Sequence, residues 1–137
     1  GLLANRITNV PGASAVLLAG YVTYSNEAKS MDLGVNPLKI ETDGAVSAEV
    51  ATEMAEGALR RTGADWALAT TGIAGPGGGT EAKPVGTVYI ALAQRSGGAT
   101  HVEHHRFRNR DRDGFKLLAG NAALDLLRRA LGWQALG

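Results

Sequence analysis

The chain has 137 residues, of which 45% are hydrophobic and 20% charged, a composition typical of one globular domain with a buried core. The net charge of +1 gives no electrostatic surplus for a nucleic-acid partner, and the absence of cysteine from these residues excludes disulfides, thiolate zinc sites and a cysteine nucleophile. No apolar run approaches the ~20 residues of a membrane span and no signal peptide is evident, so we expect a cytoplasmic protein without a membrane partner.

The first residues predict a helix, because apolar side chains recur at helical spacing until Pro11 and Gly12 end the element. The chain begins inside this apolar helical sequence and its first residue is Gly rather than Met. We therefore expect a piece of a longer protein, or one whose N-terminal part is out of view. Residues 15–24 are apolar and include β-branched side chains, so they predict a buried strand.

Two helices are expected next. Ser25 predicts the N-cap of a short helix that Gly34 and Pro37 break. The clearest helix of the chain spans residues 47–62, with Ser47 as its cap and two arginines in its last turn. Its predicted inward side chains are Val50, Ala51, Met54, Ala55, Ala58 and Leu59.

The second half of the chain predicts three strands and a helix. Residues 66–70 form a short strand, residues 85–93 a central strand covered on both faces, and residues 100–107 a polar edge strand. Residues 113–131 form the last helix. Because strands alternate with helices, we expect an α/β fold: a three-layer α/β/α domain with a central, largely parallel or mixed sheet. The last helix is expected to turn Phe115, Leu118, Ala122, Leu126 and Leu127 inward.

The stretch TTGIAGPGGGTEAKPVG, residues 70–86, places five glycines and one proline within the eight residues 72–79. It matches neither the P-loop nor the dinucleotide-binding pattern, because other residues stand where those motifs require Lys, Ser/Thr or the last Gly. The stretch follows a predicted strand, and glycine lets backbone N–H groups approach an anion closely. These residues predict a ligand-binding loop, with a plain connection between two core strands as the alternative.

The polar stretch YSNEAK, residues 24–29, stands where the predicted buried strand ends. Lys29 can serve as a general base if burial or nearby positive charge lowers its pKa, and a serine that it activates is a workable acyl-transfer nucleophile. The alternative, which the spacing alone favours, is a helix cap followed by a solvated lysine.

Two further clusters have a functional and an ordinary interpretation. His101, Glu103 and His105 share one face of the predicted edge strand and can ligate a metal, although an exposed strand can carry them without one. Four arginines before the last helix can clamp a phosphate or a carboxylate, or can be solvated and pair with neighbouring aspartates. They are Arg106, Arg108, Arg110 and Arg112.

YSNEAK (24–29), GAVS (44–47) and TGIAGPGGGTEAKPVGTVYIALA (71–93) follow one another with the order and spacing of the CinA C-terminal domain family, which the chain resembles over nearly its whole length. The third block is long and idiosyncratic, so the resemblance is specific. It implies that residues 1–137 are a single amidase domain. The implied reaction converts nicotinamide mononucleotide to nicotinic acid mononucleotide and ammonia, without a metal or organic cofactor. The resemblance also implies a homodimer or higher homo-oligomer.

The resemblance carries the catalytic lysine and tyrosine of the family to Lys29 and Tyr24. The family nucleophile is the serine of an ESCTGG motif that would end at Gly1, so the serine and the first strand are expected to precede the residues shown. A chain without that serine is expected to be inactive, and Ser25 does not replace it. The non-catalytic alternative is a nucleotide-binding or oligomerisation domain.

The implied substrate contacts lie in three segments. Ser14 matches a serine after the first helix, and the glycine-rich stretch matches the substrate-binding segment of the family. The family also carries an F-x-GDR segment before its last helix. Here Phe107 to Arg112 has an apparent one-residue insertion and no glycine, which favours Arg112 and leaves Arg110 as the alternative. The implied substrate-binding residues are Ser14, Thr71, Gly72, Gly75, Gly77, Gly78 and Arg112.

Overall fold

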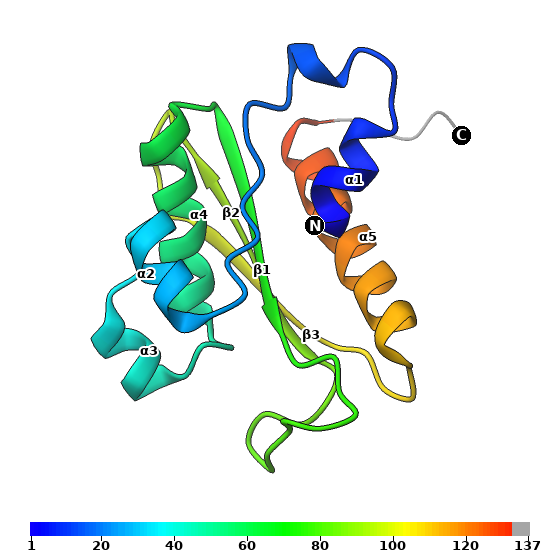
Figure 1. Cartoon of the computed structure of the whole chain (residues 1–137). Coiled ribbons are helices and arrows are strands. Elements are labelled where there is room, and N and C mark those ends of the chain that lie inside the picture. Colours follow the sequence, from blue (N-terminus) through cyan, green and yellow to red (C-terminus); the bar gives the residue numbers. More distant parts are fainter. Residues whose placement is uncertain (133–137) are drawn as a thin grey trace.

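The computed structural model describes residues 1–132 and arranges them in three layers (Figure 1). The middle layer is a sheet of β1 (Trp66–Gly72), β2 (Thr87–Gln94) and β3 (His101–Arg106). Helix α4 (Ala48–Thr62) packs on one face of this sheet and α5 (Arg112–Ala130) on the other. The expected α/β class, with helices on both faces of the sheet, is confirmed.

The direction of the strands differs from the prediction. The sheet has the order β1-β2-β3 and both pairs are antiparallel, so the expectation of a largely parallel or mixed sheet was wrong. A parallel pair needs a crossover connection, usually a helix, whereas antiparallel neighbours need only a loop or a tight turn. Residues 73–86 join β1 to β2 without a helix, and a short turn containing Gly97 and Gly98 joins β2 to β3.

The core lies on both sides of β2. On one face, Ala91 and Ala93 pack with the predicted inward side chains of α4, of which Val50, Ala51 and Ala55 are fully buried. The opposite face carries a second cluster in which the β2 side chains meet α5. Its buried members are Val88, Ile90, Leu92, Phe115, Ala119, Ala123 and Leu126. The prediction of a central strand covered on both faces is therefore confirmed.

Side-chain caps fix where the helices begin. The Ser47 hydroxyl accepts a hydrogen bond of 3.2 Å from the backbone N–H of Val50, and Ser25 caps α2 (Asn26–Leu33) in the same way. The sequence did not predict α3 (Pro37–Asp43), which Asn36 caps. Pro37 was interpreted as a break, but proline is also favoured in the first turn of a helix, and this one starts α3.

The segment before α2 departs most from the prediction. Helix α1 (Leu2–Thr8) packs on α5, and a single turn, η1 (Ala13–Ala15), follows. Residues 16–25 then run extended towards α2 and belong to no strand of the described sheet, so the expected buried strand at 15–24 was wrong. The apolar, β-branched residues favour an extended backbone, but the described residues supply no layer that covers it. Its exposed side chains include Val16, Leu18, Val22 and Tyr24.

The helices of the described part of the chain include none that is long and apolar enough to cross a membrane. Two of them carry a buried glycine in their interior, and the surroundings of these glycines differ. A Cβ at Gly57 of α4 would lie 1.8 Å from the carbonyl oxygen of Leu33, where α2 crosses closely. A Cβ at Gly120 of α5 would lie 3.5 Å from the nearest atom of Leu2, an ordinary contact.

We therefore expect Gly57→Ala to lower the free energy of unfolding by about 2 kcal/mol or more, because overpacking outweighs the better helix propensity of alanine. The matched variant Gly120→Ala should be neutral or stabilising by up to about 1 kcal/mol. Urea unfolding followed by circular dichroism measures both. Equal effects of the two substitutions would contradict the close approach of α2 and α4.

Candidate active site

Lys29 is a buried lysine in the first half of α2, with only 7% of its surface exposed. Its Nζ donates a hydrogen bond of 2.8 Å to the carbonyl oxygen of Thr23 and a longer one of 3.5 Å to that of Tyr24. Burial lowers the pKa of Lys29 below the usual value for lysine, because desolvation disfavours the ammonium form. At a given pH, Lys29 therefore supplies more of the neutral amine that a general base requires than an exposed lysine does.

Arg112 joins three segments that lie far apart in the sequence. It is the first residue of α5, after the N-cap Asp111. Its Nη1 donates to the carbonyl oxygen of Gly75 at 2.7 Å, and its Nη2 donates to the Tyr24 hydroxyl at 3.2 Å. Tyr24 is thus contacted twice, by Lys29 at its backbone carbonyl oxygen and by Arg112 at its side-chain hydroxyl, and Arg112 in turn contacts Gly75. Among residues 1–132, the side chain of Arg110 makes no such bond, and which of the two arginines contacts a substrate stays a prediction.

We call residues 73–86 the glycine loop. Two of its glycines are required by the loop itself, because Val85 packs against both. A Cβ at Gly75 would lie 2.5 Å from Cγ1 of Val85, and a Cβ at Gly79 would lie 2.6 Å from its backbone nitrogen. Gly77 has no neighbour within 4 Å of such a Cβ, and Gly78 only a distant one. A ligand can thus approach the backbone at Gly77 and Gly78, whereas Gly75 and Gly79 allow the two arms of the loop to pack.

Thr71 and Gly72 lie at the base of the glycine loop, and both are in close contact with other parts of the protein. The Thr71 hydroxyl donates a hydrogen bond of 2.7 Å to the carbonyl oxygen of Ala45. A Cβ at Gly72 would lie 2.8 Å from the ring of Phe115 and 2.9 Å from the carbonyl oxygen of Thr87. Packing alone therefore accounts for glycine at position 72. The substrate role of these two residues stays a prediction.

Ser14 is not brought together with the other predicted site residues. It lies in the exposed turn η1, at the top of Figure 1, whereas the glycine loop lies at the bottom. There it borders a shallow hollow of about 460 Å³. Within one chain, Ser14 therefore belongs to a separate surface from Lys29 and Arg112.

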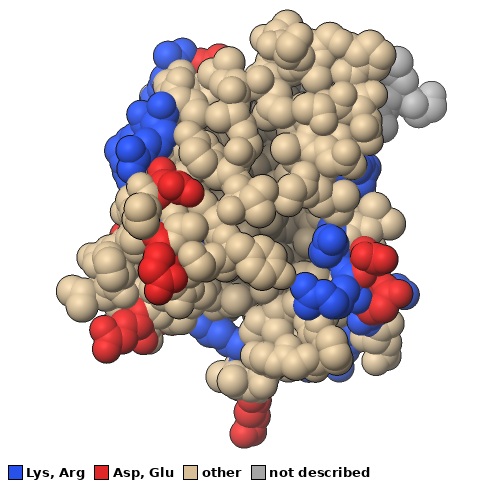
Figure 2. Space-filling view, viewed as in Figure 1, with Lys and Arg blue, Asp and Glu red and all other residues tan. Residues whose placement is uncertain are grey.

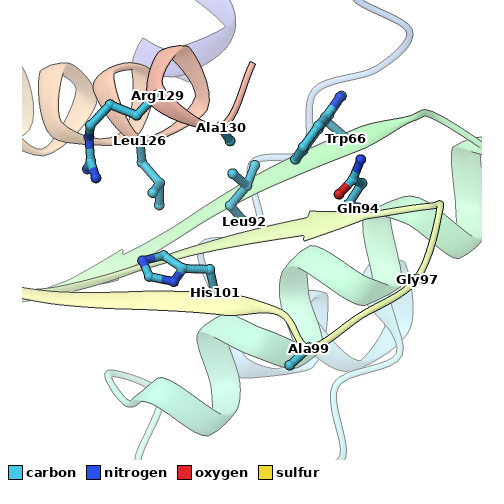
Figure 3. Close-up of a pocket in the computed structure, with 9 residues that line it drawn as sticks. All are labelled: Trp66, Leu92, Gln94, Gly97, Ala99, His101, Leu126, Arg129 and Ala130. Carbon is cyan, nitrogen blue, oxygen red and sulfur yellow. The ribbon is translucent and has the colours of Figure 1, made fainter. Parts of the chain in front are cut away.

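A second hollow of about 370 Å³ opens between the end of α5 and the sheet (Figure 3). Leu92 of β2 and Leu126 of α5 lie on its apolar side, while His101 and Arg129 bring polar groups. None of the predicted catalytic or substrate-binding residues lines it. The complete lining is Trp66, Leu92, Gln94, Gly97, Ala99, His101, Leu126, Arg129 and Ala130.

The three residues considered as metal ligands lie close together, and Glu103 pairs with Arg129. Glu103 accepts a hydrogen bond of 2.7 Å from Nη2 of Arg129 and lies 2.9 Å from Nε2 of His105. The bond to Arg129 is the main reason why the pKa of Glu103 is lowered. Within residues 1–132, no group of three or more His, Cys, Asp or Glu side chains is arranged to hold a metal ion. The spacing did place these side chains on one face, but the arrangement does not support the metal interpretation.

The charged side chains gather away from the extended segment 16–25. Figure 2 shows basic and acidic side chains next to one another around the start of α5, where Arg112 lies, and an uncharged area over the centre of this view. The exposed apolar side chains of Val16, Leu18 and Val22 come from the segment that crosses that centre. The region around Arg112 thus mixes basic and acidic side chains, and the Arg112 guanidinium lies beside the glycine loop at Gly75.

The sequence model of the CinA C-terminal domain matches residues 1–131. The chain belongs to this family. It is 55% identical over 126 residues to a "CinA-like protein" of Chlorobaculum tepidum, covering 90% of this chain and 30% of that protein. A "CinA-like protein" of Geobacter sulfurreducens is 53% identical over 131 residues, covering 96% of this chain and 31% of that protein. The chain thus spans about a third of the length of these curated relatives.

Solved structures of the family share the fold. The competence/damage inducible protein CihA from Agrobacterium tumefaciens superposes with a TM-score of 0.92 at 44% identity, covering 97% of this chain and 79% of that one. The competence damage-inducible protein A from Klebsiella pneumoniae gives a TM-score of 0.90 at 36% identity, covering 98% of this chain and 82% of that one. The resemblance of the three sequence blocks to the CinA C-terminal domain is therefore confirmed.

The environment of Lys29 predicts its titration. Because its pKa is lower in the folded than in the unfolded protein, the unfolded protein binds more protons between the two pKa values, and stability rises with pH across that window. We expect the amine of Lys29 to titrate at lower pH in the folded protein than in the urea-unfolded protein, in NMR spectra of protein with ¹³C-methylated lysines. Identical titration of Lys29 in the two states would contradict its desolvation.

Proposed function

We propose that this domain hydrolyses the carboxamide of nicotinamide mononucleotide, releasing nicotinic acid mononucleotide and ammonia, as a step of pyridine nucleotide salvage. The observation that carries the proposal is the buried Lys29 of lowered pKa, which contacts the backbone of Tyr24, a residue whose hydroxyl is held by Arg112 beside the glycine loop. These are the residues on which the family resemblance places the general base, its tyrosine partner and the substrate arginine.

In the proposed reaction, the serine of the ESCTGG motif, which the resemblance places before Gly1, attacks the amide carbon. Neutral Lys29 takes the serine proton, with Tyr24 as relay, and returns it to the leaving nitrogen as the carbon–nitrogen bond breaks. Water then hydrolyses the acyl-serine ester, which frees the carboxylate and restores the serine. Backbone N–H donors facing the tetrahedral oxyanion would each lower the barrier by about 3–4 kcal/mol.

The other end of the substrate is proposed to lie against Arg112 and the open part of the glycine loop. A nucleotide phosphate suits a guanidinium that is held in a fixed orientation, and Arg112 is held by Gly75 and Tyr24. The backbone at Gly77 and Gly78 can approach the same anion without hindrance from side chains. Fixing the phosphate end lowers the entropic cost of placing the amide beside Lys29.

The second candidate is a non-catalytic nucleotide-binding or oligomerisation domain. One observation favours it: the segment before α2 exposes several large apolar side chains, among them Val16, Leu18 and Val22. Exposed apolar side chains of this kind suit an interface between subunits. The homodimer or higher homo-oligomer stays a prediction.

The first test is ammonia release from nicotinamide mononucleotide by the full-length protein. We expect Lys29→Ala to reduce kcat by about 10²–10⁴-fold, the usual loss on removing a general base, while nucleotide binding measured by calorimetry persists. Lys116→Ala, on the exposed side of α5, is the control and should leave turnover unchanged. Full turnover by Lys29→Ala would remove the lysine from the mechanism, and nucleotide binding without turnover by the unsubstituted protein would favour the second candidate.

Separate substitutions of Arg110 and Arg112 test which of the two arginines contacts the substrate. Arg112→Ala should raise KM by about tenfold or more, because a hydrogen bond to a charged group contributes about 1.5–3 kcal/mol. Arg110→Ala, which removes the same charge two residues earlier, should change KM by less than about twofold, since a solvated charge contributes little. Steady-state kinetics on both variants decides the assignment, and the reverse order of effects would transfer the role to Arg110.

A further inference from the structure

Lys83 reaches from the glycine loop to the turn between α3 and α4. Its Nζ donates a short hydrogen bond to the carbonyl oxygen of Asp43, and its side chain is half-buried. Asp43 is the last residue of α3, where helix carbonyl groups lack partners inside the helix. An ammonium group is a favourable partner at such an end, because it meets both the free oxygen and the negative end of the helix dipole.

The turn at residues 43–45 receives side-chain hydrogen bonds at three consecutive carbonyl groups. Lys83 donates to Asp43, the Ser47 hydroxyl to Gly44 at 2.8 Å, and the Thr71 hydroxyl to Ala45 at 2.7 Å. Thr71 precedes the glycine loop and Lys83 lies near its end. Both ends of the loop are therefore tied to the same short turn, which in turn leads into the N-cap of α4.

Gly44 makes this close approach feasible. Its φ of 84° and ψ of 155° lie in a region that essentially only glycine adopts. A Cβ at this position would also lie 3.3 Å from Nζ of Lys83, tighter than most such contacts. The backbone conformation thus favours glycine at position 44, and the missing side chain leaves room for the lysine.

The backbone of Lys83 is fixed within the loop as well. Its N–H donates to the Thr80 hydroxyl at 3.0 Å, and its carbonyl oxygen accepts from the N–H of Thr80 at 2.9 Å. On the opposite arm of the loop, Gly75 is held by Arg112. The glycine loop is therefore anchored twice, to α5 through Arg112 and to the α3–α4 turn through Lys83.

We propose that Lys83 is a positioning residue of the candidate active site, which holds the glycine loop against the α3–α4 turn so that the loop backbone meets the substrate in a fixed shape. The role rests on the proposed amidase function. Lys83 acts through the loop: its ammonium group is bonded to Asp43 and need not touch the substrate. Losing the anchor costs ordering of the loop at each binding event, which weakens substrate binding and leaves the chemistry at Lys29 unchanged.

The test uses the full-length protein and Lys83→Met, which keeps the aliphatic stem and removes the donor. Without any ligand, amide hydrogen exchange in residues 73–86 and 44–46 should become about tenfold faster, because one charged hydrogen bond no longer opposes local opening. With nicotinamide mononucleotide, KM should rise about five- to tenfold, while kcat and its pH profile stay unchanged. Lys83→Arg, which retains a donor, should restore slow exchange and low KM, and Lys116→Met should change neither.

Each result decides the proposal. Unchanged exchange with a raised KM would make Lys83 a direct substrate contact and overturn the positioning role. Faster exchange with an unchanged KM would show that the anchor does not matter to binding, and would overturn it too. If the unsubstituted protein shows no amidase turnover, the proposed function fails, and the exchange data alone then decide whether Lys83 anchors the loop: faster exchange supports the anchor and unchanged exchange overturns it.

Discussion

Strand β2 is buried on both faces, since α4 packs on one side of the sheet and α5 on the other. This packing determines where the elements that carry the candidate site lie. The glycine loop leads from β1 into β2, the α3–α4 turn leads into α4, and Arg112 begins α5. Because α4 and α5 both begin at the end of the sheet from which the loop emerges, the turn and the arginine meet the loop from opposite faces (Figure 1). The site is thus a consequence of how the three layers stack.

The parts of this fold that the sequence predicted depend on local signals. The cap at Ser47 and the apolar face of α4 can be predicted from the residues of that helix alone. The continuous apolar run of β2 likewise indicates a strand that is buried on both faces. The direction of the strands, and whether residues 16–25 join a sheet, depend on what packs beside them. An apolar, β-favouring run favours an extended backbone. Its burial requires a neighbouring strand or helix, which the local sequence pattern does not identify. Pro37 shows a different ambiguity, because the same residue ends one helix and begins the next.

For the candidate site, too, the sequence predicted some features and left others to tertiary packing. The resemblance named Lys29, Tyr24, Gly75 and Arg112. In the structure, Lys29 contacts the backbone of Tyr24, and Arg112 contacts the Tyr24 hydroxyl and the backbone of Gly75. The contact of Arg112 with the loop depends on where α5 begins, since Arg112 directly follows the cap at Asp111. The separation of Ser14 from this group depends on the path of residues 16–25. The anchoring role of Lys83 had no sequence signal beyond its place in the long block, because its partner is a backbone carbonyl group 40 residues away.

Richness in glycine was the first sign of a ligand-binding loop, yet the individual glycines contribute in different ways. Gly75 and Gly79 let Val85 pack between the arms, so they stiffen the loop, while Gly77 leaves its backbone uncovered. A loop made only of flexible glycines would lose much conformational entropy whenever a ligand ordered it. Here the close packing of Val85 and the two anchors at Arg112 and Lys83 oppose that loss, because they restrict the loop in the absence of a ligand. The open backbone at Gly77 therefore lies between fixed points, which is the arrangement that a preorganised binding surface requires.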